Sequence, residues 1–203
     1  MSQQVKHNVM YTTLFWSWLG AHLVGGAVAG ILEERLQFLG TLVLVGLCIG
    51  LVQGIVLWRV ITHPIWWALI LVLGWPLSNL LWLSTRDGYQ FLVNALIATG
   101  WLWEVFWLNA TRIPIILAPL AIVQALVGLR GWRTRLLWVV LNIIGGVVVG
   151  GLGATVCRSY CTPLAQWGGA VAVGAVLGGV SWLGYGLVTA WVLGRLGVDA
   201  GRV

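Results

Sequence analysis

Long apolar runs separated by short polar segments are the feature that most constrains how this chain can fold. The runs cover residues 11–31, 37–58, 65–84, 91–109, 113–129, 136–156 and 168–194. A helix crosses a bilayer with roughly 20 apolar residues, and the alternating pattern of a membrane β-barrel is absent. Only 8% of the residues are charged, whereas a soluble domain has about 25%. We therefore predict an all-α fold, a polytopic transmembrane helical bundle forming one integral membrane domain, 1–203.

The basic residues stand singly near the ends of the apolar runs, although the net charge is +6. This distribution is typical of topology signals beside anionic lipid headgroups. It lacks the clustered basic patch that a nucleic-acid-binding protein presents. We expect membrane lipids as partners and no nucleic acid.

A nine-residue phrase occurs three times and predicts three similar helical hairpins. It reads LVQGIVLWR at 51–59, IVQALVGLR at 122–130 and LVTAWVLGR at 187–195. In the helix ahead of each phrase, a Trp precedes a Gly by seven residues; these are Trp18, Trp67 and Trp138. Such internal repeats mark one helical unit used several times. The predicted units are 11–59, 65–130 and 136–195.

The second unit is the longest, and its insertion covers 85–112. Equivalent units put Arg59 and Arg130 on the same side, so an even number of crossings separates them. The run 91–109 then does not span, and its Trp-dense sequence around Glu104 suits an interfacial or re-entrant helix. We predict six spans plus this helix, with seven spans as the alternative.

Charge counting is compatible with six spans and both termini in the cytoplasm of a bacterial plasma membrane or thylakoid. The basic residues then inside are Lys6, Arg59, Arg130, Arg133, Arg135, Arg195 and Arg202. Those outside are Arg35, Arg86, Arg112 and Arg158. Seven spans with the N-terminus outside give the same count, so the repeat decides between the two topologies.

Glycines recur at four-residue spacing and predict close helix contacts. The predicted packing positions are Gly26, Gly30, Gly46, Gly50, Gly54, Gly146, Gly150, Gly174 and Gly178. Small residues at this spacing let helix backbones approach closely in a bilayer. The partner helix is either in the same chain or in a second membrane protein.

Intramembrane polar residues are the candidate site. Gln53, Gln124 and Thr189 hold the same place in the three phrases, and such a ring either binds a substrate, ion or pigment metal or only joins helices by hydrogen bonds. His22 and Asn142 each follow a repeat Trp by four residues, and a histidine is a ligand for a metal or chlorophyll magnesium.

Glu104 is the only carboxylate inside an apolar run. Deep in the bilayer it would be a proton or cation site, whereas at the interface it would be solvated. It completes the predicted ligand or pigment candidates. The cofactor is unidentified, with lipid, carotenoid and chlorophyll as the classes considered.

The three cysteines exclude a disulfide framework but allow one local bridge. We place Cys157 and Cys161 in an outer loop, where a disulfide between them is permitted. Their spacing fits no zinc motif, so we predict no metal site. No nucleophile-elbow, zincin or P-loop motif occurs, and this favours a protein that is not an enzyme.

The chain resembles a family of largely uncharacterised polytopic bacterial membrane proteins rich in Gly and Trp, frequent in cyanobacteria and green filamentous bacteria. The residues that carry the resemblance are the Gly46/Gly50 helix, the Gln53-x5-Arg59 phrase and the Trp66/Trp67 pair. The third unit departs from the pattern at Thr189. The resemblance implies helical membrane architecture and a photosynthetic host, but no activity.

The leading functional hypothesis is a non-catalytic membrane subunit or scaffold. It would pack by its Gly faces against other membrane-protein subunits or itself, holding lipid or pigment in a photosynthetic-type membrane. The alternative is a small-molecule or ion transporter or channel with a polar ring near the axis.

Overall fold

The computed structural model describes residues 3–58, 60–61 and 63–200, and this part of the chain is helical without any strand. The helices are α1 (Gln3–Leu36), the short π-helix η1 (Gly40–Leu44), α2 (Val45–Leu57), α3 (Pro64–Ser84), α4 (Arg86–Ile97), α5 (Glu104–Gly128) and α6 (Trp132–Ala200). The structure describes only some of the basic residues that were used to predict the topology. Arg59 and Arg202 lie outside the described residues, as do the side chains of Lys6, Arg86 and Arg195.

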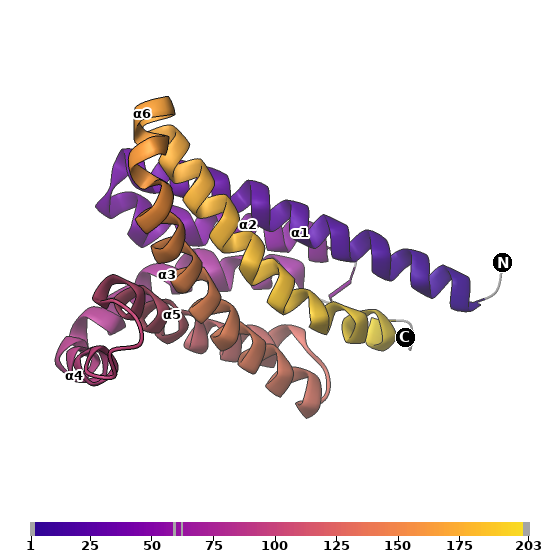
Figure 1. The fold of residues 1–203 in the computed structure, drawn as a ribbon. Coiled ribbons are helices and arrows are strands. Elements are labelled where there is room, and N and C mark those ends of the chain that lie inside the picture. The colour runs from indigo at the N-terminus through magenta and orange to yellow at the C-terminus, as the bar shows by residue number, and fades with distance from the viewer. Residues whose placement is uncertain (1–2, 59, 62, 201–203) are drawn as a thin grey trace.

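Five helices in the described chain are long and apolar enough to cross a membrane. The fifth, α6, contains two spans, because its backbone leaves the helical conformation at Gly168 and at Gly169, where φ is +62°. Glycine adopts this left-handed conformation without a Cβ penalty. The chain folds back there into a first arm (132–167) and a second arm (170–200), which run antiparallel (Figure 1). The fold is an all-α bundle with six membrane-length segments, as predicted.

The six segments form three hairpins and close into a ring. The hairpins are α1 with α2, α3 with α5, and the two arms of α6. Neighbouring hairpins also touch, because α2 packs on α3, α5 packs on α6, and α6 packs on α1. The ring order is therefore α1, α2, α3, α5, first arm, second arm. In this order α1 and α5 stand opposite each other.

The predicted packing glycines lie at the three contacts between hairpins. A Cβ on Gly26 or Gly30 of α1 would meet the backbone of Gly178 or Gly174 on the second arm. On α2, a Cβ on Gly46 would meet Trp75 and Leu71 of α3, and a Cβ on Gly50 or Gly54 would meet Ala68. On the first arm, a Cβ on Gly146 would meet Pro114 of α5, and one on Gly150 would meet Asn109. All nine glycines thus pack against other helices of the same chain.

Helix α4 is the short helix of the insertion. Its 12 residues are too few to cross a bilayer, and it runs across the direction of the long helices at the end of the bundle away from the termini (Figure 1). Tyr89 and Val93 are buried, and the Tyr89 hydroxyl donates to the Leu108 carbonyl of α5 at 2.5 Å. Burial of that hydroxyl raises the pKa of Tyr89.

The boundary of the insertion differs from the sequence-based expectation. The run 91–109 is not one helix, because residues 98–103 are not helical and α5 starts at Glu104. Residues 104–112 therefore belong to a spanning helix. Helix α5 continues through Pro114 and Pro119, which a membrane helix tolerates because its neighbours compensate for the lost hydrogen bonds.

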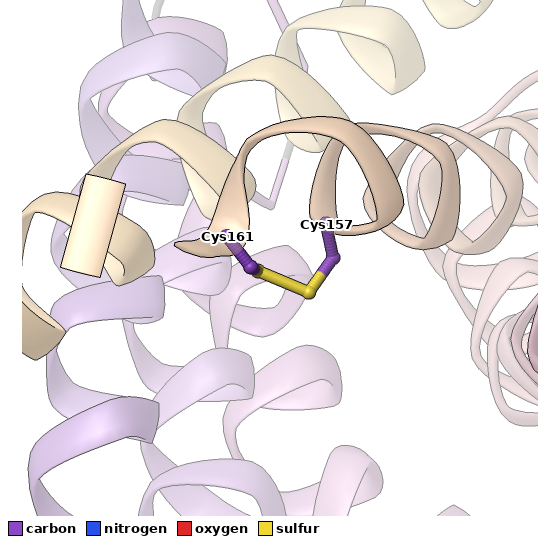
Figure 2. Close-up of a disulfide and its surroundings, with 2 residues drawn as sticks. All are labelled: Cys157 and Cys161. Carbon is purple, nitrogen blue, oxygen red and sulfur yellow. A yellow bond between two sulfur atoms is a disulfide. The ribbon is translucent and has the colours of Figure 1, made fainter. Parts of the chain in front are cut away.

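The segment 157–167 also differs from expectation, because it is helical rather than a loop. Cys157 and Cys161 project from consecutive turns of the first arm and are joined by a disulfide, with 4.5 Å between their Cα atoms (Figure 2). The helix thus extends beyond the predicted apolar run to the turn at Gly168. At the other end of the bundle, the start of α1 and the end of α6 lie on the same side (Figure 1).

Candidate functional site

Three indole rings fill the axis of the bundle. Trp18, Trp67 and Trp138 come from three different hairpins and are 0%, 1% and 0% exposed. The ring centroids of Trp18 and Trp138 lie 6.3 Å apart, and those of Trp67 and Trp138 lie 4.9 Å apart. We call these three side chains the indole layer.

The phrase residues Gln53, Gln124 and Thr189 are buried beside the indole layer. Trp67 donates from Nε1 to Gln53 Oε1 at 3.0 Å, and Trp18 donates from Nε1 to Thr189 Oγ1 at 3.0 Å. These two indoles therefore each bond to a helix of a neighbouring hairpin. The corresponding partner for Trp138 would be Gln124, but the Gln124 amide lies 3.5 Å from the Trp67 carbonyl instead. Trp138 Nε1 is buried without a hydrogen-bond partner.

His22 is hydrogen-bonded through both ring nitrogens. Nδ1 lies 2.9 Å from the Trp18 carbonyl, and Nε2 lies 3.1 Å from Gln53 Nε2. The carbonyl can only accept, so Nδ1 carries the proton and Nε2 accepts from the glutamine amide. This assigns the neutral Nδ1–H tautomer and links Trp67, Gln53, His22 and Trp18 in one chain of hydrogen bonds.

Asn142 belongs to the same buried region. Its Oδ1 accepts from the Tyr185 hydroxyl at 2.5 Å, and its Nδ2 donates to the Trp138 carbonyl at 2.7 Å. The Tyr185 ring lies 5.2 Å from the His22 ring. Five of the six candidate residues are thus brought together. The sixth, Glu104, is exposed in the first turn of α5 and lies apart from them.

A cavity of about 320 Å³ lies between all six spans at the end of the bundle away from the termini. We call it the axial cavity. Its polar lining consists of Glu33, Glu34, Thr41, Asn109, Arg112 and Ser181. Trp75 and Trp182 also line it, as does Cys157 of the disulfide. Sequence reasoning missed this site because it treated Arg112 and Glu33 as charges at span ends. The available signal was the apolar sequence on both sides of Arg112.

Arg112 is held in the cavity wall by side chains of α3. Its Nη2 donates to Asn79 Oδ1 at 3.1 Å, and its guanidinium lies 4.5 Å from the centre of the Trp82 ring. Asn79 is fixed in turn, since its Nδ2 donates to the Trp75 carbonyl at 3.0 Å. Arg112 Nε remains buried without a partner. The guanidinium is therefore oriented by α3, although its buried Nε donates no hydrogen bond.

Glu33 approaches the axial cavity from the opposite helix of the ring. Its Oε1 accepts from the Thr41 hydroxyl at 2.7 Å, which fixes the carboxylate at the turn after α1. Glu33 and Arg112 both line the cavity, but these two described side chains form no ion pair. Two opposite charges thus face one space without neutralising each other directly.

Aromatic rings separate the axial cavity from the terminal end of the bundle. The Trp75 and Trp182 centroids are 6.1 Å apart, and Tyr185 lies 5.2 Å from Trp182. His22 and the indole layer lie on the side of Tyr185 that faces the termini. The cavity is therefore closed on the side facing the termini.

Comparison with models of known protein families, with curated proteins and with solved structures finds no match to this chain. The fold and the site alone define its class, a polytopic helical membrane protein with an axial cavity. Within the residues that the structure describes, no three His, Cys, Asp or Glu side chains gather in a metal-binding arrangement.

Proposed function

We propose that this chain is a membrane transporter for a small polar solute that enters the axial cavity. The observation that carries the proposal is the cavity itself, to which every span of the ring contributes. Its volume is at the lower end of the range for small-molecule sites, about 300–1,000 Å³. Charged groups in an intramembrane cavity are costly to keep, and they are typical of substrate pathways.

The glycine contacts do not favour the scaffold hypothesis. It depended on Gly faces free to pack against a second membrane protein, whereas all nine predicted glycines contact other helices of the same chain. The proposal therefore favours the transporter alternative. A subunit or scaffold role becomes an outcome of the experiment below.

Transport requires the side of the cavity that faces the termini to open after the solute has entered from the other side. Hydrogen bonds between membrane helices average only about 0.6 kcal/mol, so the bonds around the indole layer can be exchanged without a large cost. A solute held by both Arg112 and Glu33 would draw together helices that stand opposite in the ring. We propose that this movement of the hairpins opens the indole layer while the outer end of the cavity closes.

We also propose that the protein resides in a bacterial plasma membrane or thylakoid with both termini cytoplasmic. The axial cavity then faces the outer compartment. This orientation places the Cys157–Cys161 disulfide where oxidation is permitted, which supports it.

Ligand binding can be tested by thermal unfolding of the purified protein in mild detergent. The probes are single amino acids, amines, carboxylic acids, sugars and nucleosides. Any probe that binds the folded state raises the unfolding temperature. The blocking variant is Gly153→Leu, because Gly153 lines the cavity and a Cβ there would lie 3.2 Å from Ser181 Oγ. Gly20→Leu is the matched control, since no atom lies within 4 Å of its Cβ position.

We expect at least one class of probe to stabilise the wild-type protein and Gly20→Leu but not Gly153→Leu. The same probe should show counterflow in proteoliposomes that contain the wild-type protein. The proposal fails if no class stabilises the wild-type protein. It also fails if a bound probe shows no counterflow, which would leave a binding or scaffold role.

A further inference from the structure

We infer that the solute is a small zwitterion of the amino-acid class, with one carboxylate and one cationic nitrogen. This inference rests on the proposed function and names the chemistry of the same cavity. It follows from the two opposite charges that stand on opposed helices and do not pair with each other.

Arg112 provides the carboxylate end of the site. Its guanidinium is already oriented by Asn79 and by the Trp82 ring, so little conformational freedom is lost when a ligand binds. Because Arg112 lines the cavity, a ligand carboxylate would accept a charge-assisted hydrogen bond from its guanidinium.

Glu33 provides the cationic end of the site. The Thr41 hydroxyl fixes one carboxylate oxygen, while the rest of the carboxylate remains available at the cavity wall. Glu34 adds a second negative charge to the lining, and Trp75 and Trp182 add indole rings. A cationic nitrogen is attracted both by carboxylates and by the faces of such rings.

A zwitterion suits this lining better than a simple ion does. A lone anion would bind Arg112 but meet the unneutralised charges of Glu33 and Glu34. A lone cation would bind the glutamates but add a second positive charge to a cavity that Arg112 already lines. A zwitterion neutralises charge at both ends, which offsets the cost of removing each charged group from water. A cavity of about 320 Å³ accommodates a molecule of amino-acid size.

The test compares each zwitterion with its two halves. The probes are the common amino acids and glycine betaine, together with the amines that lack the carboxylate and the acids that lack the amine. Unfolding temperature and calorimetric affinity are measured for the wild-type protein, Arg112→Gln and Glu33→Gln. Glu104→Gln is the control, because Glu104 is exposed and does not line the cavity.

We expect at least one zwitterion to bind at least about 10-fold more tightly than either half, a difference of about 1.4 kcal/mol. Arg112→Gln and Glu33→Gln should each remove this advantage, whereas Glu104→Gln should keep it. If Arg112→Gln does not fold, Glu33→Gln and the shorter Glu33→Asp carry the comparison.

The outcomes separate this inference from the proposed function. If an amine, acid, sugar or nucleoside binds as tightly as any zwitterion, the inference is wrong and the transporter proposal stands. The inference is also wrong if a zwitterion binds equally to the wild-type protein and to both cavity variants. If no probe of any class binds, both the inference and the proposed function are wrong.

Discussion

Buried polar side chains in this protein are paired chiefly with indole groups and backbone carbonyls. Gln53 uses both ends of its amide, accepting from Trp67 and donating to His22. Gln124, at the same place in the second phrase, makes only a long contact to the Trp67 carbonyl. Two residues that the sequence treats as equivalent therefore contribute differently to the structure.

This difference can be measured by replacing two indoles with Phe. Trp67→Phe leaves Gln53 Oε1 without its donor, and a buried unpaired acceptor costs roughly 1–3 kcal/mol. Trp138→Phe removes a similar volume but an N–H that has no partner. We expect Trp67→Phe to lower the free energy of unfolding by about 1–3 kcal/mol more than Trp138→Phe does. Unfolding in mixed micelles by SDS measures both, and equal losses would contradict the hydrogen-bond assignment.

At the scale of the helices, glycine contacts hold the three hairpins together. The contact between α1 and the second arm is close from both sides, because Gly30 and Gly174 each face the other's backbone carbonyl. A backbone atom cannot swing aside as a side chain can, so any larger residue there forces the helices apart.

We therefore expect Gly30→Leu to prevent correct folding, because the substitution opens the ring between its first and last hairpins. The control is Gly20→Leu on the same helix, where the new side chain meets open space. The yield of monodisperse protein and its unfolding temperature report the effect. A Gly30→Leu protein as stable as Gly20→Leu would show that this contact is not needed.

Hydropathy predicted the helices well but placed two of their boundaries incorrectly. The first arm of α6 extends past its apolar run because Arg158 projects from the helix and lies 4.4 Å from the centre of the Trp103 ring. Helix α5 includes Arg112 because that charge is held inside the bundle by Asn79 and Trp82. Hydropathy treats both arginines as loop residues, since their partners are distant in the sequence.

At the scale of the whole molecule, the axial cavity depends on closure of the ring. Sequence spacing predicted that Gln53, Gln124 and Thr189 lie at one depth and that His22 and Asn142 hold equivalent places after a repeat Trp. The same spacing says nothing of Glu33 and Arg112, which come from hairpins without a shared motif at those positions. Their side chains line the same cavity only because α1 and α5 face each other across the axis.

The central claim is that the axial cavity is open to small polar molecules while the indole layer is closed. Labelling with a membrane-impermeant hydrophilic maleimide tests it in cells that express single-cysteine variants, with Cys48 replaced by Ala and the disulfide left intact. Ser181→Cys lines the cavity, and Thr189→Cys lies beside the indole layer. We expect Ser181→Cys to be labelled in intact cells and Thr189→Cys to be labelled neither before nor after the cells are opened. Labelling of Ser181→Cys only after opening would invert the proposed orientation, and no labelling in either case would contradict the account.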